Sequence, residues 1–314
     1  MDFRLFSLLI VTSLFSSACG DETSSDSAPA VEEPVEVEPS AEPTEKAEPK
    51  QAAAKPSAAP VGPIMWSEVK LHEVIRAANP GYTGNGQFQI DQGGQVQAIA
   101  LDNCEVTDIS AFAGMKLMAL YLQGCAVADI SALKGMPLVE LYLEKSAVKD
   151  LSALKGMNSL RKLYLSGTMV EDLSPIKGLG IVEMNLVDTK VSQLDALEGM
   201  PLQMLWLTDS PVEDISGLSA SPLVSLTLHR TPVTDLSSLA NSGLQRLHIG
   251  ETPVTDLTPL KGLSLTRLVF DPTQIKEGIE GIKAMPTMEQ IGTKFEDGAN
   301  DLQAPAAFWP TQEG

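Results

Sequence analysis

The stretch "TPVTDLTPLKGL" (252–263) is nearly repeated 21 residues earlier, as "TPVTDLSSLANS" (231–242), and again as "SPVEDISGLSAS" (210–221). Regular copies run from 117 to 264, with a partial copy at 96–116 and a degraded one at 265–286. The period is interrupted only by an insertion at Asn158-Ser159. A fixed period of this length is typical of a solenoid, in which each repeat packs only against its neighbours.

Each copy begins with the pattern L-x-x-L-x-L, as in "LVELYL" (138–143) and "LRKLYL" (160–165). Alternating leucines predict a short strand with one buried face, and successive strands would stack as a parallel sheet. The second half, V-x-D-L-S-x-L, is too short for a full α-helix and predicts 3₁₀ turns on the opposite face. Ser174-Pro175 and Thr258-Pro259 fit the start of such turns, with the hydroxyl as cap.

The complete repeat resembles the short leucine-rich repeats of bacterial internalins. The resemblance covers about 170 to 190 residues and implies an α/β leucine-rich-repeat solenoid, with a parallel sheet on the concave face and 3₁₀ turns on the convex face. We expect the repeats to span 96–286.

Non-repeating segments flank the array, and we interpret them as caps at 64–95 and 287–314. In "WSEVKLHEVIRAANPGY" (66–82) the residues Leu71, Val74, Ile75 and Ala78 fall on one helical face, and Asn79-Pro80-Gly81 would end the helix. "QFQIDQGGQVQAIAL" (87–101) predicts a hairpin. "IEGIKAMPTMEQIGTKF" (279–295) predicts a last helix and strand, over which Phe308 and Trp309 would pack. Both caps resemble repeat regions of planctomycete-type bacterial proteins.

The first 18 residues contain an apolar run bounded by small residues, which predicts a signal peptide. Cys19 follows directly and resembles the acylated cysteine of bacterial lipoproteins, which implies lipidation at Cys19. Residues 19–63 are rich in Pro, Ala and Glu and predict a disordered tether. We therefore expect a lipid-anchored protein of the outer membrane or cell surface, the alternative being a secreted soluble protein.

The formal net charge of −19 argues against nucleic acid as a partner, since phosphate binding requires clustered Lys and Arg. The sequence has no G-x-S-x-G, H-E-x-x-H, C-x-x-C or Walker motif, so we expect no enzyme activity, no cofactor and no metal. One aspartate recurs in most copies, and we interpret it as a turn residue rather than a metal ladder. These residues are Asp108, Asp129, Asp150, Asp172, Asp214, Asp235 and Asp256.

Cys104 and Cys125 occupy the same position in adjacent copies, where later copies have Ser or Thr. Adjacent strands lie within disulfide range. Side chains at equal positions point the same way, which favours free thiols in a buried polar ladder. His229 and His248 are expected on the exposed sheet face. A metal there would need Glu251 or Asp271 as third ligand, so an anion contact or a plain solvated surface is the favoured interpretation.

The strand face that does not enter the core carries residues typical of interface hot spots. We predict that it binds a protein partner and that the chain is a monomer. The alternatives are a structural spacer of the envelope or cell wall, and a carbohydrate-binding protein. The predicted partner-binding residues are Tyr121, Tyr142, Tyr164, Trp206, His229, Arg246, His248 and Arg267.

Overall fold

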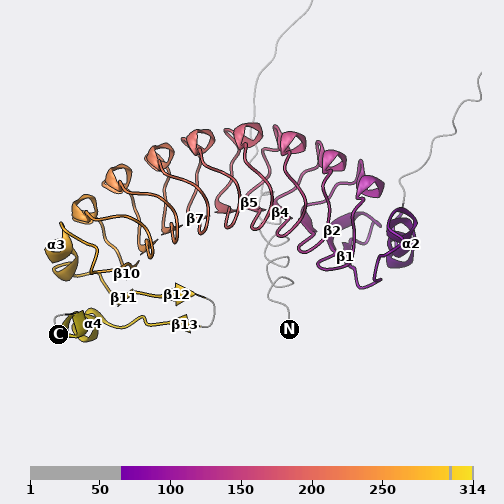
Figure 1. The fold of residues 1–314 in the computed structure, drawn as a ribbon. Coiled ribbons are helices and arrows are strands. Elements are labelled where there is room, and N and C mark those ends of the chain that lie inside the picture. The colour runs from indigo at the N-terminus through magenta and orange to yellow at the C-terminus, as the bar shows by residue number, and fades with distance from the viewer. Residues whose placement is uncertain (1–64, 297–298, 313–314) are drawn as a thin grey trace, which may run out of the picture. The chain divides into compact units, whose positions relative to one another are not determined.

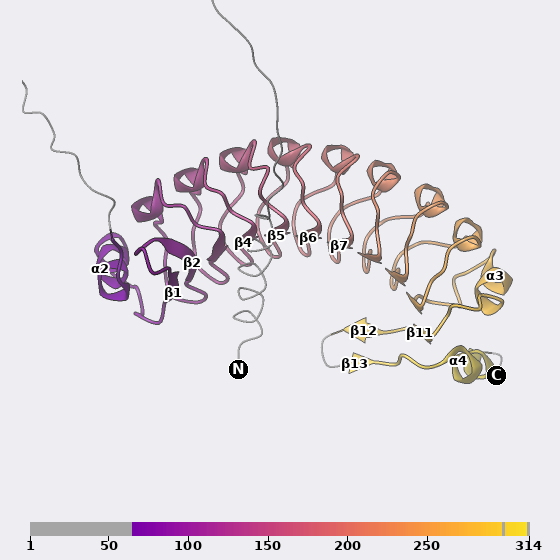
Figure 2. The ribbon, with the colours of Figure 1, turned by 180° about the vertical axis from the view of Figure 1, so that it is seen from behind.

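A computed structural model describes residues 65–296 and 299–312. The predicted signal peptide (1–18), the lipidation site Cys19 and the predicted tether (19–63) lie outside the described residues. Taken by itself, the described part is an arch of stacked repeats (Figures 1 and 2). Short strands line its inner side and single helical turns line its outer side, so the predicted leucine-rich-repeat solenoid is confirmed.

The inner side is an eleven-stranded sheet in which the strands follow chain order from β1 to β11. Strands β1 and β2 pair antiparallel, which confirms the predicted hairpin, and each later neighbour pairs parallel. The strands are β1 (Gln87–Ile90), β2 (Val96–Ala100), β3 (Ala119–Tyr121), β4 (Glu140–Tyr142), β5 (Lys162–Tyr164), β6 (Glu183–Asn185), β7 (Met204–Trp206), β8 (Ser225–Thr227), β9 (Arg246–His248), β10 (Arg267–Val269) and β11 (Gln290–Gly292).

The outer side carries one 3₁₀ turn in each repeat, from η1 (Ser110–Phe112) to η8 (Thr258–Leu260). Pro175 and Pro259 stand near the start of their turns, as predicted. The predicted hydroxyl cap is wrong, because the Ser174 hydroxyl donates to Asp172 and the Asp172 carboxylate accepts the Ser174 N–H. The carboxylate two residues before the turn thus satisfies its first N–H in seven of the eight turns, the exception being η5 (Asp195–Leu197), where Gln193 takes its place.

The core is one continuous column of leucine, valine, isoleucine and methionine side chains. Leu120, Leu141 and Leu163 are Cα partners on adjacent strands and are fully buried. The one-residue insertion at Asn158-Ser159 leaves this register unchanged, because the extra residue is absorbed in the turn before β5.

A polar ladder runs beside this core, as predicted for the cysteine position. The hydroxyls of Thr168, Thr189 and Ser210 each donate to the carbonyl three residues earlier. The Cys125 thiol lies 2.9 Å from the Leu101 carbonyl oxygen, and both Cys104 and Cys125 are buried free thiols.

The N-terminal end of the column is covered by helix α2 (Glu68–Ala78), which buries Leu71 and Ile75. Ser67 caps the helix, and Asn79 ends it. The Asn79 side chain accepts the Thr107 and Asp108 N–H groups and donates to the Asp108 carbonyl, so the cap is joined to the first repeat.

The C-terminal end is covered by helix α3 (Ile279–Lys283), strand β11 and helix α4 (Pro305–Gln312). Phe308 is fully buried and Trp309 packs against the core, which confirms the predicted apolar cover. A small hairpin of β12 (Phe295–Glu296) and β13 (Ala299–Asn300) precedes α4 and was not predicted. Among the described residues no helix is long and apolar enough to cross a membrane.

Replacing Leu163 by Ala should lower the free energy of unfolding by about 2–5 kcal/mol, because the site is fully buried between two neighbouring leucines. Urea denaturation measures this change. Lys177→Ala, on an exposed turn, is the control and should stay within about 0.5 kcal/mol of the wild type. Equal losses for the two variants would contradict the continuous core.

Candidate functional site

The candidate site is the inner face of the sheet from β3 to β10, where parallel in-register pairing places equivalent side chains in rows. Because side chains alternate along a strand, the residues on either side of each buried central leucine point into the concavity. The first row is Ala119, Glu140, Lys162, Glu183, Met204, Ser225, Arg246 and Arg267; the second is Tyr121, Tyr142, Tyr164, Asn185, Trp206, Thr227, His248 and Val269.

The second row forms an aromatic stack. The ring centroids of Tyr121 and Tyr142 lie 4.8 Å apart, and those of Tyr142 and Tyr164 lie 4.4 Å apart with an interplanar angle of 17°. Trp206 follows at 6.0 Å, beyond Asn185. The tyrosine faces therefore cover one another, so that ring edges and not ring faces are left uncovered by the neighbouring rings. Tyr121 is buried, while Tyr142, Tyr164 and Trp206 are partly exposed.

The first row supplies a charged network beside the stack, on the same face of the sheet. Lys162 Nζ lies 3.4 Å from Glu140 Oε1 and 3.9 Å from Glu183 Oε2. Tyr121 donates to Glu140 and Tyr164 donates to Glu183, over 2.7 and 3.1 Å. Burial, with smaller contributions from Tyr142 and Glu183, raises the pKa of Tyr164, so its hydroxyl stays a donor. These hydrogen bonds orient Tyr121 and Tyr164, and Tyr142 is held between their two rings.

The two histidines are not exposed, which corrects the prediction from the sequence. His229 and His248 are 5% and 6% exposed, and their rings stack with centroids 4.5 Å apart. His229 Nδ1 lies 2.9 Å from the Gly250 carbonyl, which can only accept, so Nδ1 carries the proton. Its Nε2 accepts from Arg230, whose other nitrogens donate to both carboxylate oxygens of Asp209. Sequence periodicity shows which face a side chain occupies but not what covers it.

The covering residue for His248 comes from the unpredicted hairpin. Phe295 in β12 meets the His248 ring edge to face, with centroids 6.3 Å apart. The Arg267 guanidinium carbon lies 5.1 Å from the centroid of the Phe295 ring. Figures 1 and 2 draw this hairpin on the inner side of the arch at its C-terminal end. The cap thus supplies part of the inner face, through a segment whose sequence has no repeat to reveal it.

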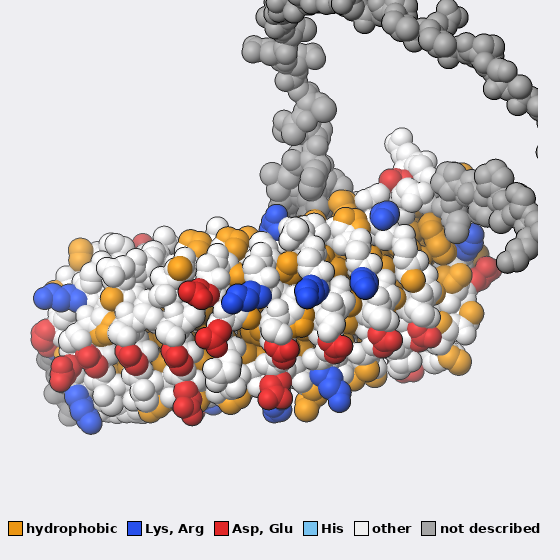
Figure 3. Space-filling view, turned by 90° about the horizontal axis from the view of Figure 1, so that it is seen from above, with side chains coloured by type: hydrophobic (Ala, Val, Ile, Leu, Met, Phe, Trp, Pro, Cys, Tyr) orange, Lys and Arg blue, Asp and Glu red, His pale blue; other side chains and the backbone are white. Residues whose placement is uncertain are grey.

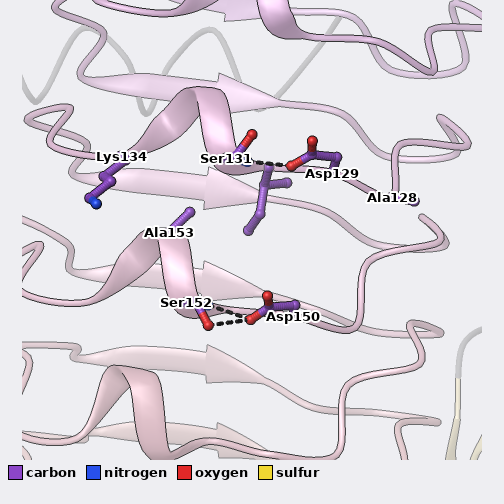
Figure 4. Close-up of a pocket in the computed structure, with 8 residues that line it drawn as sticks. Ala128, Asp129, Ser131, Lys134, Asp150, Ser152 and Ala153 are labelled. Atoms are coloured by element: carbon purple, nitrogen blue, oxygen red, sulfur yellow. Dashed lines mark hydrogen bonds between the residues drawn. The ribbon is translucent and has the colours of Figure 1, made fainter.

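The recurring aspartates lie on the outer side, where Figure 3 shows a row of acidic side chains beside basic ones. Each binds the backbone N–H two residues later, for instance Asp129 to Ser131 over 2.8 Å, which confirms the predicted turn role. In the hollow between η2 (Ser131–Leu133) and η3 (Ser152–Leu154), Asp129 and Asp150 are directed at their own turns (Figure 4).

Within residues 65–296 and 299–312, no three His, Cys, Asp or Glu side chains form a group that could hold a metal ion.

The geometry defines a leucine-rich-repeat solenoid with an open inner sheet face. The chain is similar to an internalin of Listeria monocytogenes, with a TM-score of 0.56 and 24% identity over 72% of this chain and 75% of that chain. It is also similar to internalin C2 of the same organism, with a TM-score of 0.55 and 23% identity over 64% of this chain and 92% of that chain. These similarities concern the fold. No protein-family model and no curated protein matches the chain.

The turn aspartates make stability depend on pH. Hydrogen bonds from the backbone and hydroxyl of the following Ser hold the pKa of Asp108, Asp129, Asp172 and Asp235 below the ordinary value of 3.8. The unfolded chain therefore binds more protons in this range, and stability falls as pH falls through the lowered pKa values.

The free energy of unfolding should decline below about pH 4 and change little through these groups above about pH 5. Urea denaturation of the wild type and of Asp129→Asn/Asp172→Asn measures the slope. Asparagine keeps an acceptor but cannot titrate, so the variant should show a shallower decline. An unchanged slope would mean that other groups control acid unfolding.

Proposed function

We propose that the chain is a non-enzymatic protein-interaction module whose partner binds the concave sheet face. The observation that carries the proposal is the row of Tyr142, Tyr164 and Trp206, which are partly exposed and held by ring stacking, with Tyr164 also fixed by its hydrogen bond to Glu183. Rigid aromatic side chains lose little conformational entropy on binding, and Tyr, Trp and Arg dominate interface hot spots. We assign Arg246 and Arg267 to the same surface.

The three remaining residues of the predicted site have a supporting role in this proposal and do not contact the partner. Tyr121, His229 and His248 are buried, so we assign them to support the contacting residues. Tyr121 holds Glu140, and His229 accepts from the Arg230 that binds Asp209.

The ring geometry favours a protein over a carbohydrate partner. A sugar that stacks on an aromatic platform needs an open ring face, whereas Tyr142 has a neighbouring ring on each side at 4.8 and 4.4 Å. Ring edges and hydroxyls suit the mixed polar and apolar surface of a protein.

The cellular setting that we propose is the bacterial envelope. Acylation at Cys19 would anchor the chain, and residues 19–63 would hold the repeats away from the membrane surface. In this proposal the membrane contact is made by the lipid alone, and the repeats act as a monomer.

The experiment is a pull-down of envelope proteins from the producing organism with the full-length chain. The Tyr142→Ala/Trp206→Ala variant should lose at least about tenfold in affinity for the captured protein, because two central anchors are removed. Lys155→Ala/Lys177→Ala, which alters exposed turns on the outer side, should bind like the wild type.

Thermal melting separates lost contacts from lost folding, since the Tyr142 ring also stacks on two neighbours. Full retention of the partner by the aromatic variant would refute the concave-face site. Capture of cell-wall glycan or of no protein at all would favour the carbohydrate-binding or spacer alternatives.

A further inference from the structure

The charge of the first row of the inner face changes along the sheet. At β4 to β6 the charges alternate as Glu140, Lys162 and Glu183, and they pair with one another. At β9 and β10 the row ends in Arg246 and Arg267, which are Cα partners on adjacent parallel strands. Like charges at paired positions destabilise a sheet unless an opposite charge lies between them.

Among the residues that the structure describes, neither arginine side chain has an acidic partner. Arg267 Nε donates to the Gln290 amide oxygen over 2.8 Å, and its guanidinium lies against the Phe295 ring. The Arg246 backbone N–H donates to the Val224 carbonyl, but its side chain has no hydrogen bond or ion pair to a described residue. Both side chains are partly exposed. The arginine pair, Arg246 and Arg267, is therefore a local excess of positive charge on a chain of net charge −19.

Apolar surface borders the arginine pair. Phe295 on β12 is 42% exposed. Met204 and Trp206 are partly exposed and lie on β7, which is two strands away from β9. A group bound by the two guanidinium ions would have the Phe295 ring as its aromatic neighbour, and a longer ligand that crosses β8 would reach Met204 and Trp206.

We propose that the arginine pair receives a carboxylate from an acidic side chain of the protein partner, flanked by an apolar residue that contacts Phe295 or Trp206. The proposal rests on the proposed function and names the chemistry that the partner must present. Arg267 Nε and Nη2 both donate to the Gln290 amide oxygen, so Arg267 offers its remaining Nη N–H groups and Arg246 offers its guanidinium fork. Donors on two adjacent strands suit the two oxygens of a carboxylate, and Arg–carboxylate pairs are among the strongest hydrogen-bonded contacts.

A long polyanion fits the same face poorly. Glu140, Glu144 and Glu183 share the inner face with a single Lys162, so a nucleic acid or sulfated chain that extended beyond the arginine pair would meet like charge. The face is therefore suited to a short acidic segment at β9 and β10.

The test is fluorescence anisotropy with a labelled hexaglutamate peptide and the full-length chain at low ionic strength. The wild type should bind the peptide despite its own negative charge. Arg246→Glu/Arg267→Glu should weaken binding at least about tenfold. Lys155→Glu/Lys177→Glu makes the same change in net charge on the outer turns and should weaken it less than about threefold.

Three results would overturn the proposal: no binding of hexaglutamate by the wild type, equal weakening in both double variants, or arginine-dependent binding of heparin without hexaglutamate binding. The last result would assign the pair to sulfated glycans instead. An unchanged melting temperature and circular dichroism spectrum show that the arginine variant is folded.

The same variants separate this proposal from the proposed function. Suppose that the protein captured from the envelope is lost by Tyr142→Ala/Trp206→Ala but kept by Arg246→Glu/Arg267→Glu. The concave face would then remain the binding surface, and the carboxylate assignment alone would fail.

Discussion

Each repeat of this protein can bury its leucines only against the repeats on either side. The central leucines of β3, β4 and β5 are fully buried because they stand in register on adjacent strands, and the same holds along the whole column. One repeat alone would leave these side chains in water, so stability is shared and both ends need covers. Asn79 at one end and Phe308 at the other provide those covers from segments that do not repeat.

The same register creates the candidate site. A strand that buries one face must present the other, and parallel pairing aligns the presented residues into rows. In each row, side chains from successive repeats lie side by side. Three tyrosines form a stack, alternating charges form an ion-pair network, and two arginines form a local excess of positive charge. The residues that repeat therefore build the solenoid, and the residues that do not repeat give its inner face its particular chemistry.

Much of this follows from periodicity. The leucine spacing predicts the sheet, the aspartate spacing predicts the turns, and the tyrosines can be placed on one face because they are 21 and 22 residues apart. Two contacts could not be predicted from the spacing. His248 meets Phe295 of a hairpin near the C-terminus that has no repeat to reveal it, and the capping of the Ser174 turn by Asp172 instead of by its hydroxyl depends on local backbone geometry.

The central claim is that partners meet the inner face and not the outer one. The most direct measurement is photo-cross-linking in the producing organism, with a benzophenone amino acid at Ser225 on β8 or at Ser219 on the outer turn of the preceding repeat. If partners meet the inner face, position 225 gives a cross-linked protein adduct and position 219 gives none. An adduct from position 219 alone would contradict it and assign binding to the convex side.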